Sequence, residues 1–136
     1  TLARFCKNFH LLNEDTKKRL VIENDDSPNE YSVKDLFDGV YQVIGIPITF
    51  DYFHHKFNTG GLTEEEALKM ASITWPEDVT QCCHYSESRR KEKLDESIRA
   101  QAHSDLIYEI INTYGLNIDV VIEAKSKEQA IFKRPT

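Results

Sequence analysis

The sequence predicts an α/β fold in which parallel strands alternate with helices. Four short runs are rich in apolar and β-branched residues, and the stretches between them space their apolar residues as helices do. The runs cover residues 19–23, 46–51, 78–84 and 118–123. Their near-continuous apolar character suits a sheet that is buried on both faces. Strands that alternate with helices imply parallel βαβ units with right-handed crossovers.

The expected helices are supported by their caps and by their apolar spacing. They cover residues 2–15, 32–43, 63–74 and 94–114, and a short one starts near Lys127. Ser32 is a suitable N-cap, and Thr63 followed by Glu66 forms a capping box. Apolar residues from Leu94 to Ile111 predict a long amphipathic helix that ends at Gly115.

Two architectures contain such a sheet: an open doubly wound sheet, or part of a (β/α)8 barrel. An open sheet that binds a nucleotide usually carries a glycine-rich loop directly after a strand. The pair Gly60–Gly61 precedes a helix but does not directly follow a strand. The residues by themselves leave both architectures open.

Length and composition fit one domain, or a piece of one. The chain has 136 residues, of which 40% are hydrophobic and 29% charged. No apolar run approaches the roughly 20 residues that span a bilayer, and the first ten residues lack the apolar core of a signal peptide. The three cysteines make a poor disulfide set, which favours a reducing compartment. We therefore expect no membrane association and no secretion.

The formal net charge of −6 does not provide the basic surface that is typical of nucleic-acid binders. The excess of acidic residues either serves solubility alone or includes a pocket of carboxylates that binds cations. Composition does not decide between the two.

Each predicted strand ends on a carboxylate or an imidazole: Glu23, Asp51, His84 and Glu123. Sites in barrels and open α/β sheets are built at the carboxyl ends of the strands. Capping of the next helix explains one such residue, but four of four predict side chains that converge on one spot. Carboxylates held together raise one another's pKa, and a cation removes this repulsion.

Two further histidines extend this set, because His54 lies three residues after Asp51 and His103 lies in the N-terminal part of the predicted long helix. Carboxylate and imidazole ligands without paired thiolates suit Mn, Fe, Zn or Mg better than a structural four-thiolate zinc site. A metal-activated hydroxide would then serve phosphodiester hydrolysis. The candidate metal ligands are Glu23, Asp51, His54, His84, His103 and Glu123, of which Glu23, His84 and Glu123 are also assigned to catalysis.

Other histidines and cysteines have simpler interpretations. His10 is remote from any strand end, and His55 points to the opposite side from its neighbour His54, so both are expected to be structural. Cys82 shares the facing of His84, so it is either a core residue or a residue that looks into the site.

The basic cluster at residues 86–93, SESRRKEK, is best interpreted as a solvated loop. It follows His84 directly, at the site end of the sheet. Arg89, Arg90 and Lys91 are therefore weaker candidates for contacts with a DNA backbone.

Five strings occur in order along the chain: RLVIENDD, FDYFHHKFN, CHYSE, QAHSDLI and VVIEAKSKEQA. In combination they resemble the ultraviolet-damage endonuclease family over nearly the whole chain. The resemblance implies the C-terminal half of a TIM barrel, strands 5 to 8, akin to the endonuclease IV type. It also implies an enzyme that cuts DNA immediately 5′ to ultraviolet photoproducts and uses a cluster of divalent metals, manganese first, with magnesium or zinc as alternatives.

Carried over to this sequence, the resemblance makes Glu23 the bridging metal carboxylate and makes Asp51, His54, His84, His103 and Glu123 further ligands. Asn58 and Lys125 fit the family's HHxxN and EAK patterns as site-wall or phosphate-side residues, and Asn24 is expected to help hold Glu23 in place. Cys82 departs from the family's pattern, because a lysine near the metals is usual at that position.

The resemblance leaves residues 1–136 as a single domain segment without the first half of its barrel. Half a barrel exposes two sheet edges and an apolar inner face. We therefore expect that this chain is not a self-sufficient monomer and associates with the missing N-terminal half or with a copy of itself. The expected substrate is double-stranded DNA with ultraviolet lesions, in an intracellular, DNA-containing compartment such as cytoplasm or nucleus.

Two alternatives stay open. Metal-dependent sugar isomerase or epimerase barrels use similar strand-end ligands, although the strings above favour the nuclease. The chain by itself could also be a non-catalytic fragment.

Overall fold

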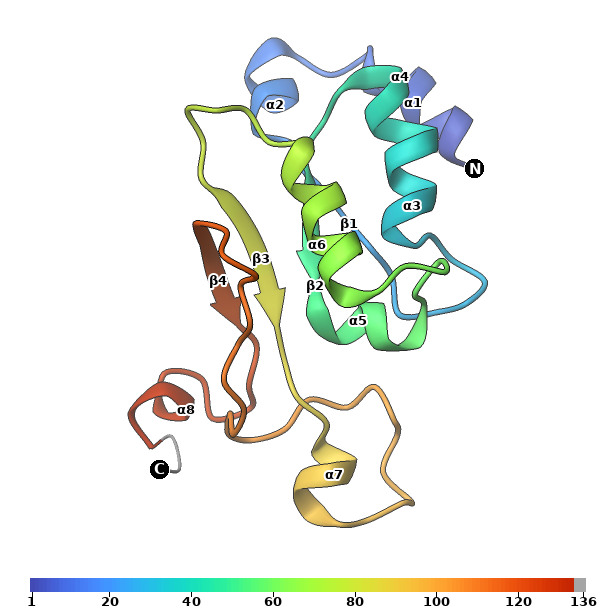
Figure 1. The fold of residues 1–136 in the computed structure, drawn as a ribbon. Helices are drawn as coiled ribbons and strands as arrows, with labels where there is room; N and C mark the ends of the chain where they lie inside the picture. Colours follow the sequence, from blue (N-terminus) through green and yellow to red (C-terminus); the bar gives the residue numbers. More distant parts are fainter. Residues whose placement is uncertain (134–136) are drawn as a thin grey trace.

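The computed structural model describes residues 1–133, in which four parallel strands form one sheet in the order β1-β2-β3-β4 (Figure 1). The strands are β1 Ile22–Glu23, β2 Ile48–Asp51, β3 Gln81–Tyr85 and β4 Ile118–Ile122. This confirms the predicted α/β fold with alternating helices and parallel strands. Among residues 1–133, β1 and β4 each have one strand neighbour, so both edges of the sheet are open.

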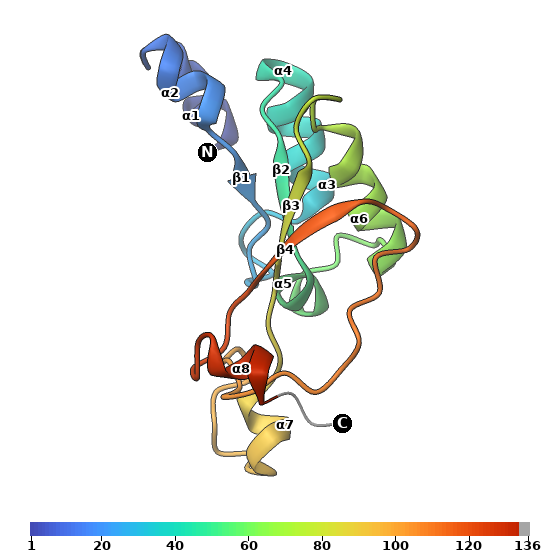
Figure 2. The same cartoon turned by 90° about the vertical axis from the view of Figure 1, so that its left-hand side faces the viewer.

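The helices connect successive strands, and α3 and α6 pack against β2 (Figure 2). Thr63 caps α6 by accepting a hydrogen bond from Glu66 N at 3.1 Å, and Ser32 forms a reciprocal capping box with Asp35 at the start of α3. None of the helices within residues 1–133 is long and apolar enough to cross a membrane. The helices are α1 Leu2–Phe9, α2 Glu14–Arg19, α3 Val33–Leu36, the π-helix η1 Phe37–Tyr41, α4 Gln42–Ile44, α5 Tyr52–Phe57, α6 Glu64–Ile73, α7 Arg89–Lys93 and α8 Gln129–Phe132.

The N-terminal region differs from the prediction. The single helix expected at residues 2–15 is in fact two, because Asn13 starts α2 by accepting a hydrogen bond from Thr16 N at 2.8 Å. Acidic residues follow this cap and basic residues end the helix, as the helix dipole favours. Helix α2 therefore extends to Arg19, and the first strand shrinks from residues 19–23 to Ile22–Glu23.

The long helix predicted over residues 94–114 is wrong: these residues form turns and extended segments. Two carboxylates take the backbone N–H groups that a helix would use. Glu92 accepts from Asp105 N and Leu106 N, and Glu87 accepts from Tyr108 N and Glu109 N, at 2.8–3.1 Å. Only part of the apolar pattern is buried, because Ile107 is 2% exposed in the core, whereas Leu94 and Ile110 are 91% and 88% exposed.

Strand alternation gives the sheet two different faces. Ile48, Phe50 and Cys83 are fully buried in the main core. The register pairs Glu23 with Thr49, Asp51 with His84 and His84 with Val121, so these residues share the other face. This inner face was expected to be apolar, but it is mixed, with Val21 and Val121 40% and 48% exposed beside polar side chains.

Candidate metal site

The carboxyl ends of the strands bring the predicted residues together. His84, in the penultimate position of β3, places its Nδ1 atom 3.2 Å from Glu23 Oε1 and 3.7 Å from Glu123 Oε1. His54 Nδ1, on α5, lies 3.5 Å from the same Glu23 oxygen. The parallel register explains the convergence, because neighbouring strands end at one edge of the sheet.

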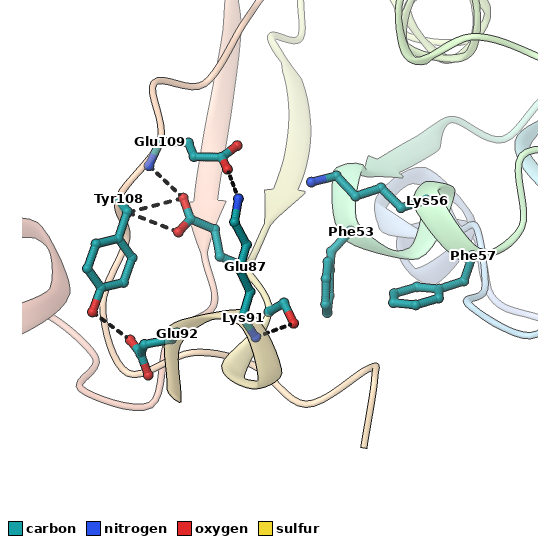
Figure 3. A pocket seen from close by; sticks show the side chains of 9 residues that line it. Phe53, Lys56, Phe57, Glu87, Lys91, Glu92, Tyr108 and Glu109 are labelled. Atoms are coloured by element: carbon teal, nitrogen blue, oxygen red, sulfur yellow. Dashed lines mark hydrogen bonds and ion pairs between the residues drawn. The ribbon is translucent and has the colours of Figure 1, made fainter. Parts of the chain in front are cut away.

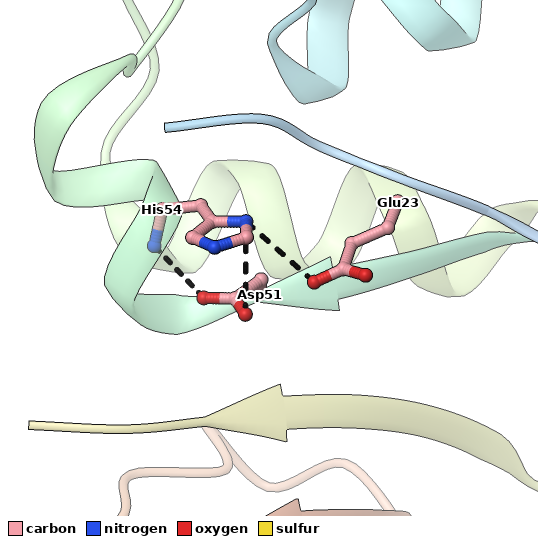
Figure 4. A group of neighbouring side chains, drawn as sticks. All are labelled: Glu23, Asp51 and His54. Carbon is pink, nitrogen blue, oxygen red and sulfur yellow. Dashed lines mark hydrogen bonds and ion pairs between the residues drawn. The ribbon is translucent and has the colours of Figure 1, made fainter. Parts of the chain in front are cut away.

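Two overlapping groups of side chains could hold metal ions. One consists of Glu23, Asp51 and His54, and the other of Asp51, His84 and Glu123; within each group the ligand atoms lie within 4.8 Å of one another. Figure 4 shows the first group, with the His54 ring and the two carboxylates turned toward one another. The carboxylate common to both groups is Asp51, whereas the resemblance assigned the bridging role to Glu23.

Asp51 is the most constrained of these side chains. It is 0% exposed and caps α5, a helix absent from the sequence prediction, by accepting hydrogen bonds from Phe53 N and His54 N at 2.8 Å each. Its second oxygen, Oδ2, is buried and has no hydrogen-bond partner among residues 1–133. Burial raises the pKa of Asp51 and outweighs the lowering effect of His54, while nearby Glu23 raises it further. A cation would satisfy this oxygen, so the donor set fits a metal.

His54 is held by the loop after β1. Its Nδ1 atom lies 2.8 Å from Asn24 O and 3.7 Å from Asp51 Oδ2. Burial alone would lower the pKa of His54, but the Asn24 carbonyl and the carboxylates of Asp51 and Glu23 raise it overall.

His103 lies at the margin of the site. Its Nδ1 atom is 3.9 Å from Glu123 Oε2, and its ring meets Phe53 edge-on at 5.8 Å. It comes from an antiparallel bridge with Ser88 and not from the predicted helix. It belongs to neither three-residue group found in residues 1–133.

The other predicted site residues have varied surroundings. Asn58 donates to Ser27 O at 2.9 Å and Glu30 O at 3.2 Å, so it holds the loop after β1. Cys82 is half-buried on the face of His84, and burial raises the pKa of its thiol. Lys125 has an exposed side chain, and its backbone N–H donates to Ser104 O.

The three basic residues proposed for DNA contacts form the start of α7 and are engaged within the chain. Arg89 pairs with Asp105 at 2.6 Å, Arg90 Nε donates to Ile98 O at 2.7 Å, and Lys91 pairs with Glu109 at 2.8 Å. The cluster is thus a short capped helix with intramolecular partners, where a solvated loop was expected.

The two histidines predicted to be structural lie outside the site. His55 is 4% exposed and packs against Phe50, with ring centroids 5.4 Å apart, and burial lowers its pKa. His10 ends α1 and contacts Phe9 edge-on.

A cavity of about 590 Å³ lies beside the site and was missed by the sequence analysis. Figure 3 shows Phe53 and Phe57 on one side of it and Tyr108 with the carboxylates of Glu87, Glu92 and Glu109 on the other. Glu87 and Glu92 accept hydrogen bonds from residues 105–109, and Glu109 pairs with Lys91. The i, i+4 spacing of the two phenylalanines was the available signal, but the opposite wall depends on tertiary structure.

Several known proteins are similar to this chain over nearly its whole length. The model of the family described as "UV-endonuclease UvdE" matches residues 1–134. The chain is 38% identical to the "UV-damage endonuclease" of Schizosaccharomyces pombe, covering 98% of this chain and 22% of that protein. It is 28% identical to the "UV DNA damage endonuclease" of Bacillus cereus (strain B4264), covering 97% of this chain and 42% of that protein.

A solved structure is also similar to this chain over nearly its whole length. The structure titled "Crystal Structure of SacUVDE" matches with a TM-score of 0.77 and 31% sequence identity, over 97% of this chain and 43% of that one. The chain therefore spans less than half the length of these relatives, which is consistent with part of a TIM barrel. Because the family model covers nearly every residue, this chain belongs to the UvdE family of UV-endonucleases.

Proposed function

We propose that this chain forms strands 5 to 8 of the barrel of a metal-dependent DNA-repair endonuclease, which nicks double-stranded DNA 5′ to ultraviolet photoproducts. The family membership and the names of the relatives support the substrate. The observation that carries the proposal is the Asp51 side chain, which both candidate ligand groups share and whose buried Oδ2 atom has no hydrogen-bond partner within residues 1–133.

The residues that would hold divalent metal are Glu23, Asp51, His54, His84 and Glu123, with His103 at the margin. When bound, such ions lower the pKa of a coordinated water and stabilise charge that develops on a phosphate. Manganese is the first candidate, and magnesium or zinc are the alternatives.

The candidate ligands hold one another in position. Glu23 Oε1 lies between His54 Nδ1 and His84 Nδ1, so one carboxylate orients two rings. Asp51 Oδ1 is committed to capping α5, which leaves Oδ2 directed to the site. We assign catalysis to Glu23, His84 and Glu123, which form a continuous chain of contacts across β1, β3 and β4.

The open edges of the sheet support the second part of the proposal. Among residues 1–133, β1 and β4 lack outer neighbours, and the relatives are more than twice as long as this chain. An N-terminal half with its own four strands would pair with both edges and close the barrel.

The decisive experiment is nicking of irradiated duplex DNA by the full-length protein, with Mn²⁺ and after chelation. We expect Glu23→Ala and Glu123→Ala each to lower the nicking rate by about 100-fold or more. Even the mutation of a residue that only hydrogen-bonds to a metal ligand typically lowers activity by about 10- to 100-fold. Chelation should abolish nicking, and added Mn²⁺ should restore it.

Glu77→Ala is the matched control, because this exposed glutamate precedes β3, at the opposite end of the sheet from the site. It should nick at the wild-type rate. Unchanged activity in Glu23→Ala and Glu123→Ala would refute the proposal, and ketose–aldose conversion without nicking would favour the sugar isomerase alternative.

A further inference from the structure

The side chain of Asn24 lies where β1 stops pairing with β2. Strand β1 ends at Glu23, opposite Thr49, whereas β2 continues to Asp51. Asn24 is 1% exposed, and its amide takes over the pairing: Asp51 N donates to Oδ1 at 2.8 Å, and Nδ2 donates to Asp51 O at 3.1 Å. A side chain thus supplies the donor and acceptor that another backbone residue of β1 would supply.

The main chain of Asn24 contacts a second candidate ligand. His54 Nδ1 lies 2.8 Å from Asn24 O. Because a carbonyl oxygen only accepts hydrogen bonds, Nδ1 carries the proton in this contact, and Nε2 is the unprotonated nitrogen of the neutral ring. Metal-binding histidines commonly donate their other ring N–H to a backbone carbonyl in this way.

The Asp51 carboxylate cannot turn independently of its backbone. Its Oδ1 atom is tied to Phe53 N and His54 N, so the direction of Oδ2 follows the peptide that Asn24 clamps. Asn24 also directly follows Glu23. One buried residue therefore bonds to two candidate ligands and adjoins a third.

We propose that Asn24 is a positioning residue of the metal site, which fixes the Asp51 backbone and the tautomer of His54 and so sets the metal affinity. This inference rests on the proposed function, because it requires that the site binds metal. It goes beyond holding Glu23 in place, since the contacts are to Asp51 and His54.

The test is Mn²⁺ binding to the full-length protein, measured by the electron paramagnetic resonance signal of free Mn²⁺. Asn24→Ala should weaken Mn²⁺ binding by about 10- to 100-fold. Asn24→Leu keeps the approximate size and adds no charge but loses both hydrogen bonds to the Asp51 backbone, so it should also bind more weakly and serves if the alanine variant fails to fold. Nitrogen NMR of the metal-free protein should show the Nδ1–H tautomer of His54 in the wild type and in Asn24→Ala alike, because residue 24 keeps its backbone carbonyl. A loss of Mn²⁺ affinity in Asn24→Ala would then report the side-chain hydrogen bonds to Asp51.

Thr74→Val is the matched control for stability. Thr74 is 4% exposed, and its Oγ1 accepts from Ile48 N at 2.8 Å, which is a side-chain contact to the other end of the same strand. This variant should lower the thermal unfolding temperature and leave Mn²⁺ affinity unchanged. Wild-type affinity in Asn24→Ala, or an equal loss in Thr74→Val, would overturn the inference. A wild-type protein that binds none of Mn²⁺, Mg²⁺ and Zn²⁺ would instead overturn the proposed function.

Discussion

At the scale of single residues, two buried glutamates decide the path of the chain after α7. Glu92 has a side chain that is 4% exposed and accepts hydrogen bonds from Asp105 N, Leu106 N and the Tyr108 hydroxyl. Glu87 likewise accepts hydrogen bonds from Tyr108 N and Glu109 N. A charged acceptor that bonds several backbone donors competes effectively with a helix for those donors.

We expect Glu92→Gln to lower the free energy of unfolding by about 1–3 kcal/mol, the usual cost of leaving buried donors without a charged acceptor. Urea denaturation of the full-length protein at pH 7 would measure this loss. Glu96→Gln is the control, because Glu96 is 91% exposed and pairs only loosely with Arg90 at 3.5 Å. A loss in Glu92→Gln no greater than that in Glu96→Gln would contradict the role of Glu92.

The effect of Glu92 should depend on pH. Burial alone would raise its pKa, but hydrogen bonds from Asp105 N, Leu106 N and Tyr108, with Lys93, lower it below the ordinary value of 4.5. A carboxyl group whose pKa is lowered by folding stabilises the protein above its unfolded-state pKa, and this contribution is lost as pH falls through the folded-state pKa. The difference between wild type and Glu92→Gln should thus be constant from neutral pH to about pH 5 and shrink below about pH 4. A difference that grows on acidification would contradict this.

At the scale of elements, the connection between α5 and α6 packs against the start of α3. Gly60 has a φ of +60°, and a Cβ atom there would lie 2.8 Å from Ser32 Cβ and still closer to Ser32 Oγ. Ser32 is the N-cap of α3, so this glycine lets two helix ends approach each other.

Gly60→Ala should therefore destabilise the protein by more than Gly61→Ala. Both positions have positive φ, which costs about 1–2 kcal/mol for a residue with a Cβ atom. A Cβ at Gly61 would meet nothing within 4 Å, so only Gly60→Ala adds a clash and disturbs the α3 cap. Free energies of unfolding from urea denaturation would give the comparison, and equal losses would show that Ser32 adjusts without cost.

At the scale of the whole molecule, the sheet is incomplete within residues 1–133. Both edge strands present unpaired backbone groups, and exposed Val21 and Val121 lie on the inner face. Unpaired edges of this kind associate with other strands.

We expect the isolated chain to self-associate, with a sedimentation coefficient that rises with concentration. Val121→Lys should reduce this association, because a lysine on an edge strand opposes pairing. Lys34→Glu, a surface change on α3 away from the sheet edges, should leave it unchanged. A stable monomer at all concentrations would contradict the proposal that the chain needs a second half or a copy.

The sequence by itself determined the order of the four strands, the caps of α3 and α6, and the polar residues at or next to the carboxyl ends of the strands. Those features are local, because apolar spacing, capping residues and strand ends are encoded within a few positions. Register then brought Glu23, Asp51, His84 and Glu123 together, as their positions at strand ends predicted.

Only the tertiary structure decided what residues 94–114 become, which carboxylate the two ligand groups share, and how Asn24 extends the β1–β2 pairing. Each of these depends on hydrogen bonds between residues far apart in sequence: Glu87 with residues 108 and 109, and Asn24 with Asp51. Helical spacing of apolar residues predicts a helix only while the backbone N–H groups lack better acceptors. The folded chain supplied those acceptors from buried side chains, so long-range contacts overrode the local pattern.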